Sequence, residues 1–133
     1  MSAAVAWRPL VAAALLLAGC ADPAPAVSRA AAAAAAAARQ TELVREWAQA
    51  SQDLPNLLFA LEDRLDVLGE ARTLPPGLDG PALATARTEL AALRAGWARA
   101  TERVQAGDLG GAVASARDLR DRAGLLWGRL GAP

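Results

Sequence analysis

Residues 53–70 read DLPNLLFALEDRLDVLGE, and the spacing of the leucines in this stretch decides the fold. Leucine recurs three or four positions apart, which is the period of a helix with one apolar face. Asp53, with Pro55 in the first turn, predicts the start of this helix, and we expect it to end between Gly69 and Arg72. The apolar stripe consists of Leu54, Leu57, Leu58, Leu61, Leu65 and Leu68.

Two more amphipathic helices are predicted on the C-terminal side of this stretch. Residues 73–77 (TLPPG) form a loop, because proline lacks a backbone N–H and clashes with the preceding helical turn. We expect the next helix to open at Asp79 and to stop at residues 105–107, and we expect Asp108 to cap the last helix. Their apolar stripes are Leu83, Ala86, Leu90, Leu93, Trp97, Ala100 and Val104 in the first, and Leu109, Ala112, Val113, Ala116, Leu119, Ala123, Leu126, Trp127 and Leu130 in the second.

A fourth helix is predicted on the N-terminal side. Ser28 is its expected cap, and it continues past Trp47 to about Ser51. Nine alanines occupy residues 30–38, and alanine favours a helix strongly while offering little apolar surface to bury. Two interpretations stay open for this segment, which are a helical spacer and a surface for close packing against another backbone.

Four one-sided helices with short connections bury their apolar faces most economically against one another. We therefore expect residues 28–133 to form an all-α domain, a small up-and-down four-helix bundle made of two antiparallel helical hairpins. The length of 133 residues fits one such domain and not two. A single Phe, no Tyr and four Trp argue against an aromatic-rich sandwich or barrel.

The amino-terminal residues have the composition of a secretion signal. Arg8 is followed by an unbroken apolar run over residues 10–18, and a small residue, Gly19, precedes Cys20. The run is too short for a membrane-spanning helix, which needs roughly 20 apolar residues. We expect residues 1–19 to be a signal peptide and residues 20–27, which contain two prolines, to be an extended, flexible tether.

The residues Leu17, Ala18, Gly19 and Cys20 resemble the lipobox of bacterial lipoproteins. The resemblance implies that Cys20 receives a diacylglycerol and an N-acyl chain, and that the three residues before it are recognised by a signal peptidase. Two or three acyl chains, at about 0.8 kcal/mol per buried CH₂, anchor a protein stably to a membrane. Ala21, rather than an Asp, directly after the cysteine favours the outer membrane over the inner membrane by the same resemblance. An ordinary signal peptide that is cleaved elsewhere is the alternative.

The residue content argues against catalysis. The chain has no His and one Cys, which leaves no imidazole base, no usual haem ligand and no Cys/His zinc site. Gly107, Gly110 and Gly111 lack the Lys and Ser/Thr of a phosphate-binding Walker loop. The 14 basic and 14 acidic residues are interleaved, so a nucleic acid partner is not expected. We expect no enzyme, no metal and no cofactor beyond the chains on Cys20.

Phe59 does not fit the apolar stripe of its helix. At 100° per residue it lies about 150° from the centre of the stripe, on the side that carries Asp63, Asp66 and Glu70. The ring either covers the alanine-rich helix or forms an exposed anchor for a partner. The three carboxylates are either a solvated face or a site for a divalent cation or a basic partner.

Trp47 and Trp97 lie on the apolar stripes of their helices and are expected to approach the same end of the bundle. They are either core residues or the walls of a small-ligand pocket with Arg94 at its rim.

These observations predict a lipid-anchored, periplasm-facing helical domain that acts without catalysis. Its expected role is that of an accessory or scaffolding component of the bacterial cell envelope, with the membrane and an envelope protein as partners. The alternative is a small-molecule or lipid binder that uses the bundle interior, which would need more space than ordinary packing leaves.

Overall fold

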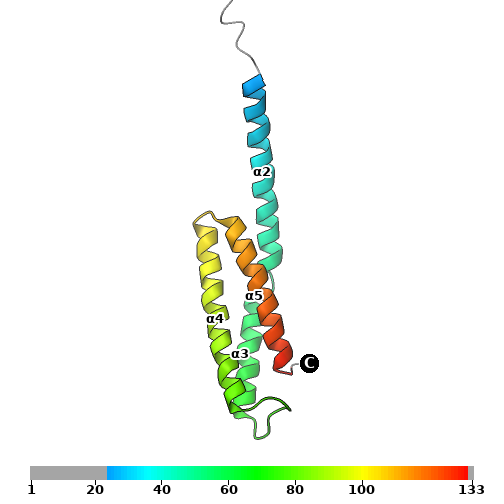
Figure 1. Ribbon diagram of the computed structural model, residues 1–133, viewed down its shortest axis with the longest axis vertical. Coiled ribbons are helices and arrows are strands. Elements are labelled where there is room, and N and C mark those ends of the chain that lie inside the picture. The colour runs from blue at the N-terminus through cyan, green and yellow to red at the C-terminus, as the bar shows by residue number, and fades with distance from the viewer. Residues whose placement is uncertain (1–23, 132–133) are drawn as a thin grey trace, which may run out of the picture. The chain divides into compact units, whose positions relative to one another are not determined.

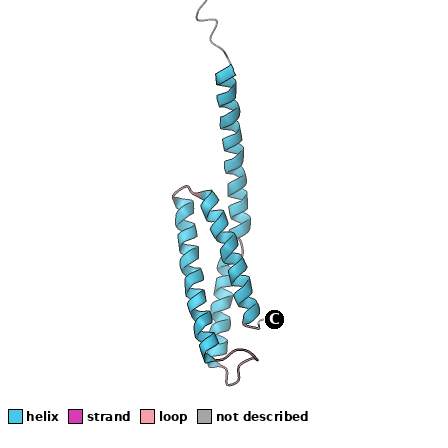
Figure 2. Ribbon diagram, viewed as in Figure 1, coloured by secondary structure: helices cyan, strands magenta, loops and turns pink. Residues whose placement is uncertain are grey.

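The computed structural model describes residues 24–131, and these residues are almost entirely helical. The helices are α2 (Ala24–Ser51), α3 (Leu54–Glu70), α4 (Gly80–Gln105) and α5 (Leu109–Arg129), as labelled in Figure 1. No strand occurs within the described range, and Figure 2 shows only loops between the helices. The predicted all-α class is confirmed.

The chain divides into two units, Met1–Ala38 and Arg39–Pro133. The described part of the first unit is the alanine-rich part of α2, whose side chains over residues 25–38 are exposed. The second unit contains the last turns of α2, from Arg39 onward, together with α3, α4 and α5. The hydrophobic core lies in this second unit.

Helix α2 begins at Ala24, four residues before the expected cap. Pro25 lies in its first turn, where the missing N–H of proline costs no hydrogen bond. Ser28 therefore lies inside the helix, and the prediction of an extended tether is wrong for residues 24–27, because alanine and a proline in the first turn both favour helix. Residues 1–23, with the predicted signal peptide and Cys20, lie outside the described residues.

Between α2 and α3 the chain bends and does not reverse. Asp53 keeps a right-handed helical backbone (φ −102°, ψ −5°), and its carbonyl accepts the N–H of Leu57 at 2.9 Å. Pro55 explains the break, because its ring excludes a helical carbonyl four residues earlier, and α2 ends at that residue, Ser51. The second unit thus holds three packed helices, of which the first is bent and consists of the end of α2 and α3. The expected hairpin between the first two helices is not formed.

Helices α4 and α5 form the predicted antiparallel hairpin (Figure 1). Gly107 closes the turn with φ 85°, a left-handed conformation that glycine adopts without strain. Asp108 then caps α5, since its carboxylate accepts the N–H of Gly111 at 3.0 Å. Gly96 lets the two helices approach closely, because a Cβ at this position would lie 2.6 Å from a methyl carbon of Leu119.

Helix α3 packs against both members of the hairpin. Arg87 of α4 donates to the backbone carbonyl of Leu65 at 3.1 Å, and Arg64 donates to the carbonyl of Leu130 beyond α5 at 3.3 Å. Between α3 and α4, Asp79 caps α4 by accepting the N–H of Ala82 at 2.8 Å. These polar contacts lie around a core built from leucine and alanine, and no charged or polar side chain is buried among the described residues.

The core follows the predicted stripes closely. All leucines of the α3 stripe are buried except Leu57, which is half-buried. The buried cluster is made of Leu54, Leu58, Leu61, Leu65, Leu68, Ala86, Leu90, Leu93, Ala100, Leu119, Ala123, Leu126 and Leu130. Among the described helices, none is long and apolar enough to cross a membrane.

Candidate functional site

The exposed aromatic residue of the second unit lies on α3. Phe59 is 70% exposed, and its ring is on the opposite side of the helix from the buried leucines. Val67, two turns further along, is 53% exposed. The inner face of α3 carries the buried leucines at positions 54, 58, 61, 65 and 68. Phe59 projects from the opposite face and therefore cannot reach the core.

Three carboxylates share the outer side of α3 with Phe59. Asp63, Asp66 and Glu70 follow the ring at intervals of four, seven and eleven residues, and all three are exposed. Asp66 pairs with Arg87 of α4 at 3.4 Å, whereas Asp63 and Glu70 form no ion pair with any described residue. We call Phe59, Asp63, Asp66, Val67 and Glu70 the α3 face; it combines an apolar anchor with uncompensated negative charge.

A divalent-cation site is one of the roles that the sequence leaves open for these carboxylates. In the part of the chain that the structure describes, no group of acidic residues is arranged to hold a metal ion. Asp63, Asp66 and Glu70 are three, four and seven residues apart, so they lie in a row along one side of the helix over about two turns. The exposed ring and the neighbouring carboxylates give the α3 face an apolar centre with negatively charged side chains around it.

The two predicted tryptophans meet. Trp47, in the last turns of α2, stacks on Trp97 of α4 with ring centroids 5.6 Å apart and an interplanar angle of 5°. Both side chains are half-buried and pack against the core. Such a parallel offset pair contributes about 0.5–1.5 kcal/mol beyond its buried area. The facing surfaces of the two rings cover each other, so they join α2 to α4.

Arg94 points to a different partner. Its guanidinium pairs with Glu62 of α3, and the two residues line a shallow groove between α3 and α4 together with Arg87. The structure therefore brings Trp47 and Trp97 together and engages Arg94 in an ion pair across the neighbouring helix interface.

Ion pairs on the surface also connect the other elements. Arg117 of α5 reaches Glu46 of α2 at 3.3 Å, in place of the local pair with Asp121 that its spacing suggests. Arg129 of α5 pairs with Glu89 of α4, and this hydrogen-bonded carboxylate raises the pKa of the arginine above its ordinary value. Exposed pairs of this kind each contribute roughly 0–1 kcal/mol.

One polar cluster was not singled out from the sequence. A groove between α4 and α5 is lined by Arg99 and Arg103 on one side and by Ser115, Asp118 and Arg122 on the other. The available signal was two arginines four residues apart, which lie on the same side of a helix and repel each other. Because carboxylates are interleaved with the arginines along the sequence, most arginines have a possible acidic partner nearby. Among the described residues, most arginines do form such a pair, and Arg99 and Arg103 do not.

Comparison with known proteins finds no matching family model, no matching curated protein and no matching solved structure. The residues predicted to direct lipidation, Leu17, Ala18, Gly19 and Cys20, lie outside the described residues.

Proposed function

We propose that this chain is a lipid-anchored protein of the bacterial cell envelope that faces the periplasm and acts without catalysis, as an accessory or scaffolding component. The anchoring part of the proposal is supported by Leu17, Ala18, Gly19 and Cys20, placed directly after the apolar run of residues 10–18. Acyl chains on Cys20 would hold the protein in the membrane. Ala21 after the cysteine favours the outer membrane.

The start of α2 fits an anchor at this position. Only three residues separate Cys20 from Ala24, the first residue of α2, and an extended chain of three residues spans at most about 10 Å. The alanine-rich part of α2 over residues 24–38 follows, with a length of about 22 Å at 1.5 Å per residue. In this proposal that segment is a helical spacer between the anchor and the second unit.

The contact part of the proposal is carried by one observation, which is the exposure of Phe59 within the α3 face. Large aromatic side chains are frequent anchors of protein interfaces, and a surrounding rim of charge selects the partner. Because Asp63 and Glu70 are uncompensated, the expected partner is an envelope protein with basic side chains around an apolar pocket.

The anchor is tested by expressing the full chain and Cys20→Ala in a host that processes lipoproteins. We expect the parent to lose residues 1–19, to gain the mass of its acyl chains and to sediment with membranes, while the variant does none of these. Intact mass spectrometry and membrane fractionation give the result. An unmodified thiol at Cys20 in a membrane-free protein would overturn the proposed location.

The contact is tested by placing a photo-crosslinking residue at position 59 and, as a matched control, at position 125. Leu125 of α5 is exposed to the same extent as Phe59, at 70%, but lies outside the α3 face. We expect a specific crosslinked envelope protein from position 59 only, and its loss when Asp63 and Glu70 are changed to Lys. Equal crosslinking from both positions would exclude the α3 face as the contact.

A further inference from the structure

Most arginines of the second unit are matched with a carboxylate. Seven of them form ion pairs, with Glu42, Glu46, Asp53, Glu62, Asp66, Glu89 and Asp118 as the acidic partners. The other five arginines of this unit have no carboxylate partner among the described residues, and they are Arg39, Arg64, Arg72, Arg99 and Arg103. Two of them, Arg99 and Arg103, belong to α4. These two residues are one helical turn apart on α4 and line the same groove.

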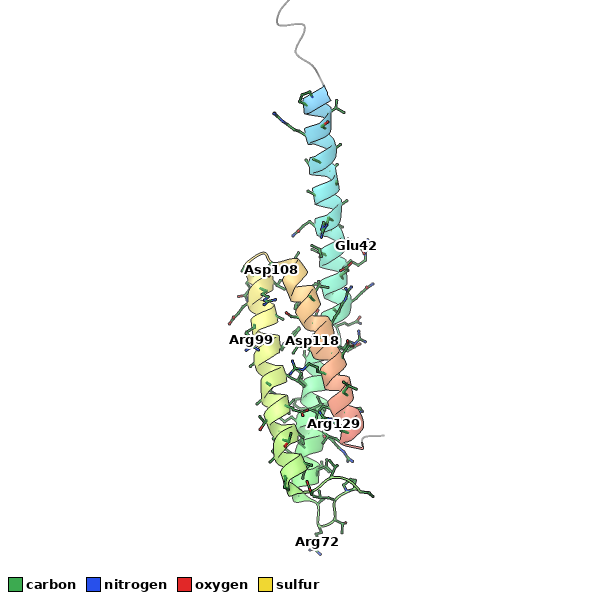
Figure 3. All side chains as sticks on the ribbon, in the orientation of Figure 1. Glu42, Arg72, Arg99, Asp108, Asp118 and Arg129 are labelled. Atoms are coloured by element: carbon green, nitrogen blue, oxygen red, sulfur yellow. The ribbon has the colours of Figure 1, made fainter. Side chains whose placement is uncertain are left out.

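The groove lies between α4 and α5 and faces solvent. Its floor is the close approach of Gly96 to Leu119, and its walls carry the charged residues. On the α5 side, Arg122 pairs weakly with Asp118 at 3.5 Å. Figure 3 shows Arg99 and Asp118 on these two neighbouring helices.

Hydrogen bonds hold one of the groove's arginine side chains, Arg103, in place. Arg103 donates one bond to the hydroxyl of Ser115 at 3.1 Å and one to the backbone carbonyl of Gly111 at 3.3 Å. The hydroxyl proton of Ser115 is then free to be directed elsewhere, because its oxygen serves as the acceptor. Arg99 has no hydrogen-bond or ion-pair partner among the described residues, so all its donors face solvent.

The charges of this groove do not balance. Three arginines and one carboxylate line it, which leaves a local charge of +2 in a chain whose formal net charge is zero. Like charges one turn apart on a helix destabilise it by a few tenths of a kcal/mol. An anion bound between the arginines removes this repulsion.

We propose that the α4–α5 groove, formed by Arg99, Arg103, Ser115 and Arg122, binds a phosphate group. The planar guanidinium fork donates two parallel hydrogen bonds to phosphate oxygens, and three forks around one groove suit the several oxygens of a tetrahedral anion. The same chemistry is offered by the headgroup of an anionic phospholipid and by free phosphate. Asp118 pairs with Arg122 and therefore competes with the phosphate group for this guanidinium, which weakens binding.

Binding is measured on the full chain in a nonionic detergent by following the arginine Nε–Hε resonances in ¹⁵N NMR spectra. The two probes are inorganic phosphate and dihexanoylphosphatidylglycerol, each titrated against sodium chloride at equal ionic strength. We expect saturable shifts of the resonances of Arg99, Arg103 and Arg122 and no saturable shift with chloride.

Three variants make the test specific. The double variant R99Q/R103Q should weaken binding by at least about tenfold, because it removes charge-assisted hydrogen bonds. D118N should tighten binding by roughly threefold, since it removes a repulsive charge and frees Arg122. R120Q is the matched control, as Arg120 pairs distantly with Asp53 at 3.9 Å and does not line the groove; binding should be unchanged.

The two titrations also distinguish between a lipid headgroup and free phosphate as the source of the phosphate group. Saturation by the phospholipid alone assigns a lipid headgroup, and saturation by inorganic phosphate alone assigns a soluble ligand; both results support the site if they depend on Arg99 and Arg103. Three results would overturn it: saturation by neither probe, an affinity that R99Q/R103Q leaves unchanged, and weaker binding by D118N.

Discussion

At the scale of single residues, the closeness of α4 and α5 depends on the missing side chain of Gly96. A Cβ there would lie within 2.6 Å of Leu119, which is itself 3% exposed and held by the core. Gly124, on α5, is the opposite case, because nothing lies within 4 Å of its virtual Cβ. The two glycines have the same helical backbone preference and differ only in what surrounds them.

We expect Gly124→Ala to stabilise the protein by up to about 1 kcal/mol, because alanine is the better helix former. Gly96→Ala should lack this gain and be less stable than Gly124→Ala by at least about 1 kcal/mol, since Leu119 must shift within a packed core. Urea denaturation of both variants measures the difference. Equal free energies of unfolding would mean that Leu119 moves aside without cost.

At the scale of elements, the three described N-caps of the second unit differ in what their aspartates do. Asp79 and Asp108 each accept a backbone N–H from their helix, at 2.8 and 3.0 Å. Asp53 makes no such bond, because its own backbone is still helical and its carboxylate does not reach back over α3. The residue type predicted a cap at all three positions, but the backbone conformation decided whether the side chain could serve.

Asp108→Ala should therefore destabilise the protein by about 1 kcal/mol, through the loss of the bond to Gly111. Asp53→Ala is the matched control, and it should cost only a few tenths of a kcal/mol, since it removes one exposed ion pair to Arg120 at 3.9 Å. Thermal unfolding followed by circular dichroism at 222 nm reports both changes. A cost for Asp53→Ala as large as that for Asp108→Ala would contradict this assignment.

At the scale of the whole molecule, the second unit is held together by apolar packing, and its charges lie on the surface. The described core contains leucine, alanine and valine with no buried charged or polar side chain. The ion pairs that join its helices are exposed and are screened by salt. Stability should therefore depend strongly on the leucines and weakly on ionic strength.

Raising sodium chloride from low concentration to about 1 M is expected to change the free energy of unfolding by less than about 1 kcal/mol. Leu61→Ala, at a residue that is fully buried, should instead cost about 3 kcal/mol. Urea titrations at the two salt concentrations compare the two effects. A salt effect that exceeds the effect of Leu61→Ala would show that ion pairs, and not the core, dominate.

The sequence by itself determined the elements of the second unit. The bounds of α3, α4 and α5 agree with the leucine spacing and with the signals at Asp53, Asp79 and Asp108, because helix starts, stops and amphipathic faces depend on residues within one or two turns. The position of Phe59 opposite the leucine stripe followed from the same local geometry, whereas its 70% exposure decides between the two roles that the sequence left open for the ring. The start of α2 was missed, since prolines fit a first turn as well as a tether.

The tertiary structure alone decided how these elements meet. Whether the chain bends or reverses at Asp53 depends on backbone angles and on long-range packing. The leucine stripe of α3 could be buried in either arrangement, so it does not predict which one forms. The stack of Trp47 on Trp97 and the arginine-lined groove between α4 and α5 likewise join residues far apart in the chain. Periodicity specifies which face of a helix is buried, and only packing selects the face that it meets.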